Sequence, residues 1–166
     1  MERTVDSAES TPYLSFKLDG EVFALPIARV REVLEWPRLT RLPKTPPFMV
    51  GVINLRGGVV PVVDLRRKFD LPAREATVDS SIIIIEASHG GKAFVIGALV
   101  DAVKAVIRLG AEAVEKAPHV GMRLSGAFLR GIGRCGGEFV ILLEPERLFS
   151  LEEMQVWEDS PAPVVA

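Results

Sequence analysis

Apolar and polar side chains alternate along much of the first half of the chain, which predicts short β-strands. The alternation runs from Tyr13 to Leu18, and the Asp19-Gly20 pair that follows is typical of a hairpin turn. A second alternating stretch extends from Val30 to Trp36. The segment 37–47 holds four prolines and is predicted to be an irregular connector.

Two apolar runs, Gly51–Leu55 and Val59–Val63, are separated by Gly57-Gly58 and predict a pair of strands. The segment from Asp64 to Phe69 then reads as a helical turn, with Asp64 placed to cap its N-terminus. A polar linker is expected over 70–80.

The second half of the chain also predicts short β-strands. Strands are expected at 82–86, 93–100, 103–107, 128–132 and 139–143. A short helix is expected from Ala111 to Ala117, ended by Pro118, and a terminal helix from Pro145 to Trp157. Many short strands with glycine and proline turns predict an all-β fold with minor helix, as a barrel or a sandwich.

The chain also carries an internal duplication. A shift of 80 residues places Gly51 on Gly131 and Asp64 on Glu144 without a gap. Upstream, segments beginning at Gly20 and Val30 resemble later ones at shifts of 71 and 73 residues. Growing shifts are expected when loops lengthen between duplicated strands. We therefore expect two similar β-lobes, about 12–70 and 80–150, packed on each other.

Arg56 is set apart from this duplicated scaffold because its counterpart, position 136, is glycine. Asn54 beside it corresponds to Arg134. An arginine offers a rigid fork of donors, and a neighbouring glycine allows a partner's backbone to approach closely. Two interpretations remain open for Arg56: docking of a partner, or a salt bridge to Glu32 or Asp64.

The charge balance changes this picture only locally. The 166 residues have a net charge of −2, but 29–74 holds ten Lys/Arg against four Asp/Glu. From Glu138 onward there are seven acids and one arginine. This bias is either an ordinary solvated surface or a basic docking face.

The two ends are expected to lie outside the folded domain, as a disordered tail over 1–11 and a loose tail over 155–166. The longest apolar run, Ala93–Val100, is too short for a helix that spans a bilayer, and the acidic start does not resemble an export signal. With Cys135 as the single cysteine, we expect a reducing, cytoplasmic compartment and no intrachain disulfide.

Candidate chemistry is sparse. Gly131–Gly136 matches the dinucleotide fingerprint GxGxxG, but a predicted strand follows it where the motif needs a helix. His89 and His119 lack metal-ligand spacing, and Cys135 lacks a local nucleophile signature. The sequence therefore predicts no catalytic residues, no cofactor and no metal. Few aromatic residues are free for base stacking, which disfavours nucleic-acid binding.

The segment from Gly51 to Arg66 reads GVINLRGGVVPVVDLR. It is preceded by Val30-x-Glu32-Val33 and followed by Val100-Asp101-x-Val103 and Gly131-Ile132-Gly133. Together these stretches resemble the CheW coupling proteins of bacterial chemotaxis. The resemblance covers about residues 12–154 in order, and its strongest part is the pattern Asn-Leu-Arg-Gly…Pro…Asp-Leu-Arg between positions 54 and 66.

This resemblance implies two five-stranded, SH3-like β-barrels around a shared hydrophobic core, followed by a C-terminal helix. It implies a non-catalytic adaptor that couples the cytoplasmic tip of methyl-accepting chemoreceptors to the regulatory domain of a CheA-type histidine kinase. Such an adaptor would be recruited to membrane-associated receptor arrays without inserting into the membrane. The positions that match family contact residues, together with Asn54 beside Arg56, are Val30, Glu32, Gly51, Asn54, Arg56 and Gly57.

One departure concerns a second kinase contact, for which relatives can carry a basic residue and an aromatic residue near Pro118. The matching positions here are Glu115 and Val120. This contact is therefore weaker, or the kinase partner carries compensating charge. The alternative from a different class is a β-barrel module that binds nucleic acid or an anionic ligand through the basic face.

Overall fold

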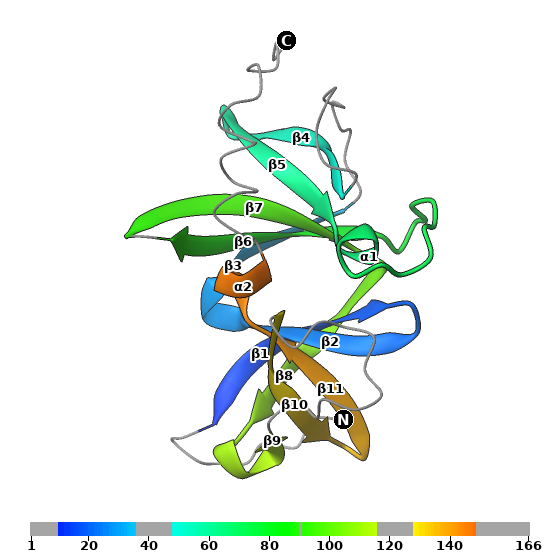
Figure 1. Ribbon diagram of the computed structural model, residues 1–166, viewed down its shortest axis with the longest axis vertical. Helices are drawn as coiled ribbons and strands as arrows, with labels where there is room; N and C mark the ends of the chain where they lie inside the picture. Colours follow the sequence, from blue (N-terminus) through cyan, green and yellow to red (C-terminus); the bar gives the residue numbers. More distant parts are fainter. Residues whose placement is uncertain (1–9, 36–47, 90, 116–127, 149–166) are drawn as a thin grey trace.

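The fold was analysed in a computed structural model, which describes residues 10–35, 48–89, 91–115 and 128–148. Two curled antiparallel-rich sheets form two lobes, stacked along the long axis of the molecule (Figure 1). Most described residues are in strands, which confirms the expected all-β class with two SH3-like lobes and few helices. One sheet has the five strands expected of each lobe, whereas the other has six, because a two-residue strand is added at its edge.

Lobe A, the lower lobe in Figure 1, has the strand order β8-β1-β2-β11-β10-β9. Its strands are β1 (Thr11–Leu18), β2 (Glu21–Pro26), β8 (Ala102–Leu109), β9 (Val114–Glu115), β10 (Leu129–Cys135) and β11 (Glu138–Leu143). Lobe B has the order β3-β6-β7-β5-β4. Its strands are β3 (Val30–Glu35), β4 (Met49–Leu55), β5 (Gly58–Asp64), β6 (Ser81–His89) and β7 (Lys92–Val100). The helical turns are η1 (Ile27–Arg29), α1 (Leu65–Lys68), η2 (Ala111–Ala113) and α2 (Pro145–Leu148).

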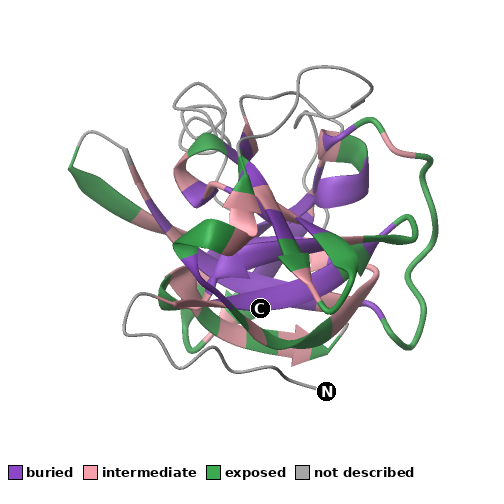
Figure 2. Ribbon diagram, turned by 90° about the horizontal axis from the view of Figure 1, so that it is seen from below, coloured by how far each residue is buried: buried purple, intermediate pink, exposed green. Residues whose placement is uncertain are grey.

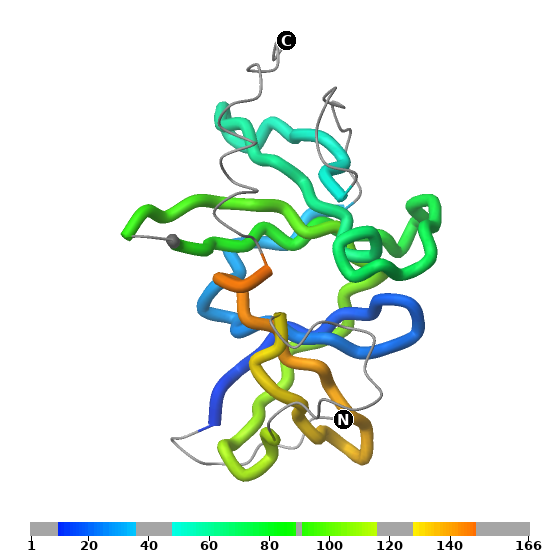
Figure 3. Tube along the Cα trace, viewed as in Figure 1, coloured from blue at the N-terminus to red at the C-terminus, as the bar shows by residue number. Residues whose placement is uncertain are grey.

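The expected division into one lobe over 12–70 and another over 80–150 is wrong. Lobe A combines β1 and β2 with four strands from the second half, and lobe B combines β3, β4 and β5 with β6 and β7. Figure 3 shows this mixing directly, because blue, yellow-green and orange segments share the lower lobe. The first repeat comprises β1 to β5 and the second comprises β6 to β11. Lobe A takes the hairpin β1–β2 from the first repeat and its other strands from the second. Lobe B takes the hairpin β6–β7 from the second repeat and its other strands from the first.

Chain connectivity explains the exchange. If β3 closed onto its own hairpin it would lie antiparallel to β1, as β8 does, and so parallel to β2. Two parallel strands of one sheet need a crossover connection of about a dozen residues or more between them. Only the three residues of η1 connect β2 to β3, so β3 leaves the sheet and pairs with β6.

The duplication itself is visible in the strand register. In the β4–β5 hairpin, Gly51 is opposite Val62 next to a bulge; in the β10–β11 hairpin, Gly131 is opposite Leu142 next to the same bulge. Both hairpins end in a one-turn helix, α1 or α2. The two sheets are therefore built to one plan.

The core is shared between the lobes, as expected. One buried cluster joins side chains of lobe A, such as Phe16 and Leu25, to side chains of lobe B, such as Ile83 and Ile96. Figure 2 shows the buried strands running through the centre of the molecule. Stacked rings extend from Phe16 through Phe23 to Phe69, with centroid separations of 6.0 and 5.9 Å.

Several element boundaries differ from the expectations. β1 already begins at Thr11, which pairs with Leu109. The expected helix from Ala111 is only the 3-10 turn η2, followed by β9, because Val114 and Glu115 pair with β10. The α2 turn is the described part of the expected terminal helix. The connector 37–47 lies outside the described residues.

Candidate functional site

The β4–β5 turn is the centre of the candidate site. Its two residues are Arg56 and Gly57, since Leu55 and Gly58 are already paired, one position earlier than the expected Gly57-Gly58 break. Both turn residues have positive φ, 51° and 81°, as a type I′ hairpin turn requires. The Gly57 N–H donates to the Asn54 Oδ1 at 3.1 Å, so Asn54 also stabilises the turn.

Arg56 joins this turn to the edge strand β3. Its guanidinium donates to both carboxylate oxygens of Glu32, at 2.5 and 3.2 Å. The Arg56 side chain is nevertheless 75% exposed, and Glu32 is 24% exposed. The hydrogen bond and the charge of Glu32 raise the pKa of Arg56. Of the two salt bridges considered, the structure forms the one to Glu32, while Asp64 accepts from the Arg66 N–H at the start of α1.

Positive φ is costly for an arginine and ordinary for glycine, which occupies the corresponding turn position 136 in lobe A. Strained backbone of this kind clusters at binding sites, where the surrounding structure maintains it. The backbone geometry therefore reinforces the asymmetry between the repeats that singles out Arg56.

The other expected site residues lie farther inside. Val30 is half-buried, opposite Ile85, and its side chain packs against the shared core. Gly51 is buried beside the β4 bulge. The structure thus brings Glu32, Asn54, Arg56 and Gly57 together at the end of lobe B, and gives Val30 and Gly51 scaffold positions in the same lobe.

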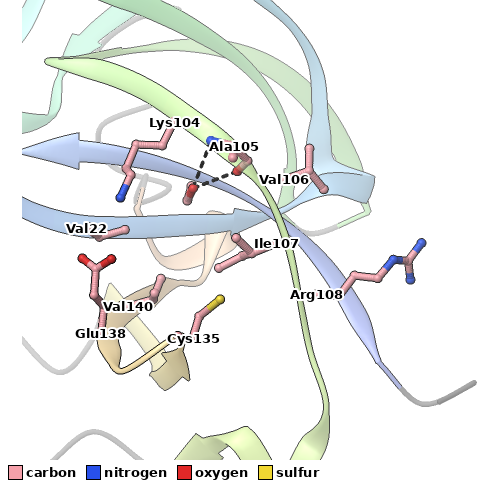
Figure 4. Close-up of a pocket in the computed structure, with 11 residues that line it drawn as sticks. Val22, Lys104, Ala105, Val106, Ile107, Arg108, Cys135, Glu138 and Val140 are labelled. Atoms are coloured by element: carbon pink, nitrogen blue, oxygen red, sulfur yellow. Dashed lines mark hydrogen bonds between the residues drawn. The ribbon is translucent and has the colours of Figure 1, made fainter. Parts of the chain in front are cut away.

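The equivalent positions in lobe A carry small residues. Ala105 and Gly136 stand where lobe B has Glu32 and Arg56, and both line a pocket of about 400 Å³. Charged residues, among them Lys104, Arg108 and Glu138, also line this pocket (Figure 4). The Ser15 Oγ donates to the Ala105 carbonyl at 2.8 Å and accepts from the Ala105 N–H at 3.2 Å. The two lobes share a plan but present different chemistry at this point.

The basic stretch is largely compensated. Each described arginine between positions 29 and 74 has a carboxylate partner at 2.5–3.6 Å. The pairs are Arg29–Glu146, Arg31–Glu86, Arg56–Glu32, Arg66–Asp101, Arg67–Asp64 and Arg74–Asp101. Over its described part, this stretch therefore offers no uncompensated arginine face for nucleic acid or another polyanion.

Sequence reasoning missed the Arg66–Asp101 pair, which is more buried than the Arg56 site. Arg66 donates through Nε and Nη2 to the two Asp101 oxygens, both at 2.7 Å, and Asp101 also accepts from the Asp19 N–H. Burial acts to raise the pKa of Asp101, but the bonds from Arg66 and Asp19 outweigh it and lower that pKa. The two residues are 35 positions apart, and the fold alone brings them together.

Of the remaining candidates, His119 and the side chain of His89 lie outside the described part of the structure. The glycines of 131–136 lie along β10 and its turn into β11, so no helix follows them. Among the described residues, His, Cys, Asp and Glu do not gather in groups of three that could bind a metal ion. No helix in the described ranges has the length and apolarity needed to cross a bilayer.

The second-contact position Glu115 lies on β9, where its carboxylate is 3.9 Å from the Arg134 guanidinium. Both side chains are more than half exposed, so this is a loose surface pair. Val120 lies outside the described residues.

These features define a two-lobed β-barrel protein whose candidate site is an exposed hairpin turn. A sequence model described as the CheW-like domain matches residues 12–153. The chain belongs to this family, and membership confirms the chemotaxis adaptor function expected from the sequence.

Individual relatives agree with this assignment. The chemotaxis protein CheW of Klebsiella aerogenes is 37% identical over 86% of this chain and 83% of its own length. The Rhizobium meliloti protein of the same name is 32% identical over 86% and 89% of the two chains. The crystal structure of the scaffolding protein TtCheW from Thermoanaerobacter tengcongensis superposes with a TM-score of 0.77 at 34% identity, covering 86% of this chain and 94% of that one.

Proposed function

We propose that this protein is a non-catalytic adaptor that couples the cytoplasmic tip of methyl-accepting chemoreceptors to the regulatory domain of a CheA-type histidine kinase. It acts in the cytoplasm, recruited to receptor arrays at the membrane. The relatives described as chemotaxis and scaffolding proteins support this role. Of the six positions expected from the sequence, Glu32, Asn54, Arg56 and Gly57 would contact the partner, and Val30 and Gly51 would support them from inside lobe B.

Arg56 carries the proposal for this site. Its side chain is the exposed member of the cluster, it occupies a backbone conformation that disfavours it, and the equivalent turn of lobe A has glycine instead. Glu32 holds two of its donors and leaves the remaining guanidinium edge for a partner. A backbone carbonyl or carboxylate of the partner suits that edge.

The test is Arg56→Ala, with binding to a receptor-tip fragment and to the kinase regulatory domain measured separately. Loss of a docking arginine is expected to weaken binding to at least one of them by about 1–3 kcal/mol. The urea-unfolding midpoint should change little, since the side chain is exposed.

Arg31→Ala is a matched control. Like Arg56, Arg31 is exposed and pairs with a carboxylate, but it lies on β3 and its partner is Glu86. Arg31→Ala is expected to bind both partners normally. Normal binding by Arg56→Ala, or equal losses in the two variants, would refute the docking role of Arg56.

A further inference from the structure

Two ion pairs join corresponding elements of the exchanged lobes but with opposite polarity. Each joins the second residue of a one-turn helix to the residue immediately before the strand that crosses between lobes. In lobe B, Arg66 of α1 pairs with Asp101 before β8 at 2.7 Å. In lobe A, Glu146 of α2 pairs with Arg29 before β3 at 2.6 Å.

The two pairs correspond because each sheet contains one parallel strand pair that brings a helix to the end of a hairpin from the other repeat. β5 runs parallel to β7 in lobe B, so α1, which follows β5, lies beside the end of β7. β11 runs parallel to β2 in lobe A, so α2 lies beside the end of β2. In both lobes a helix from one repeat therefore meets the hairpin end of the other repeat.

Because the repeats exchange strands, a second copy of the chain offers an alternative partner. Two first repeats from different copies could exchange strands in the same way, leaving the two second repeats to pair likewise. In such units each strand pair between repeats is replaced by its counterpart from the duplication: β1 pairs with β3 where it now pairs with β8, and β2 pairs with β5 where it now pairs with β11. The plan of the sheets is kept, and association of two copies becomes more competitive as protein concentration rises.

The charges oppose this alternative. A unit of two first repeats would place Arg66 of one copy beside Arg29 of the other, and this contact would occur twice. A unit of two second repeats would place Glu146 beside Asp101, again twice. Like charges at these sites are unfavourable, most of all at the Arg66 and Asp101 positions, where the side chains are only 7% and 13% exposed.

We propose that the reversed polarity of these two ion pairs makes the first repeat pair with the second repeat and not with a copy of itself. The interface between repeats is thereby a selective surface: the hairpin end of each repeat accepts only a helix of opposite charge.

The test reverses one pair in the full chain, Arg29→Glu together with Glu146→Arg. This variant keeps an attractive pair in the monomer, but it also makes both like-repeat units attractive. Arg66 would then meet the glutamate introduced at position 29, and Asp101 would meet the arginine introduced at position 146. The control, Arg29→Ala with Glu146→Ala, removes the pair without creating either new attraction. Each variant and the wild type are refolded from urea at low and high protein concentration, and dimer is measured by size-exclusion chromatography with light scattering.

The reversed variant is expected to yield about fivefold more dimer than the alanine control at high concentration, on the scale of a few weak ion pairs. Its monomer should nevertheless be at least as stable to urea as that of the control. The dimer should persist on dilution until the chain is unfolded, because swapped strands separate only by unfolding. Equal dimer yields in the two variants, or a dimer that dissociates promptly on dilution, would overturn the proposal.

Discussion

At the scale of single residues, Asp101 couples protonation to folding. Its pKa is lowered in the folded protein, because the hydrogen bonds from Arg66 and Asp19 exceed the effect of burial. The unfolded chain therefore takes up the proton first as the pH falls. The stabilisation is complete above the ordinary carboxyl value of 3.8 and is lost as the pH falls through the lower folded value.

We predict that Asp101→Asn flattens the dependence of unfolding free energy on pH in this acidic range. At neutral pH the variant should lose about 1–3 kcal/mol, because the Arg66 guanidinium is left without its carboxylate. Urea titrations at a series of pH values measure both effects. Glu75→Gln, which also neutralises a carboxylate but at an exposed position, is the control, and its unfolding free energy at neutral pH should match that of the wild type. If the unfolding free energy of Asp101→Asn depended on pH as strongly as that of the wild type, Asp101 would not be the group that couples protonation to folding.

Asp64 affects the pH dependence of the unfolding free energy in the opposite direction to Asp101. Burial raises its pKa in spite of the Arg66 N–H and the nearby Arg67. Its contribution is present at low pH and is lost as the pH rises from the unfolded toward the folded value. Asp64 and Asp101 therefore affect the dependence of stability on acidic pH with opposite signs.

Arg56 allows stability to be separated from docking. Asparagine tolerates positive φ better than arginine and favours type I′ turns. We predict that Arg56→Asn stays within about 0.5 kcal/mol of wild type in stability, since the relieved turn offsets a lost surface ion pair. Partner binding should fall as it does in Arg56→Ala. Stability and binding that decline together would indicate that Arg56 serves only the fold.

At the scale of elements, β7 depends on a glycine where three strands meet. A methyl group at Gly97 would lie 2.8 Å from the Ile82 side chain and 3.2 Å from the Val62 side chain. We predict that Gly97→Ala lowers the free energy of unfolding by about 1–3 kcal/mol, through overpacking of lobe B. Gly58→Ala, whose methyl group would only touch the Leu55 carbonyl at 3.4 Å, should change it little. Thermal unfolding of the two variants distinguishes them.

Local patterns predicted the strands well because they record which face of each strand is buried. The hairpin turn at Asp19-Gly20 and the Asp64 cap were also confirmed, because each depends only on residues that are neighbours in the sequence. The helix expected from Ala111 was wrong because pairing of Val114 with β10 outweighs the helix propensity of alanine. A strand's partner is a non-local property, and the exchange between repeats was therefore not predictable from alternation.

The candidate site shows the same contrast between local features, which the sequence predicts, and contacts between distant segments, which it does not. Comparison of the repeats identified Arg56, because a residue unlike its counterpart stands out in sequence. The partner of Arg56 was one of two carboxylates considered, and the structure selects Glu32. Nothing local links Arg66 to Asp101, so that pair emerged only from the fold.

At the scale of the whole molecule, the exchange makes the two halves of the chain interdependent. The exposed segment 72–79 is the described connection between them. We predict that a chain cleaved at a protease site inserted there remains a one-to-one complex under native conditions, because each lobe contains strands from both fragments. Size-exclusion chromatography after cleavage, with and without urea, measures this. Separation of the fragments without denaturant would contradict it.

The three-residue connection between β2 and β3 also has an evolutionary consequence. A gene that lost either repeat would encode no complete barrel, whereas many duplicated folds can shed one copy and keep the other. Selection therefore acts on both repeats as a single inherited unit. Point substitutions that make the repeats differ, such as the one that distinguishes Arg56 from Gly136, are the route by which they can still diverge.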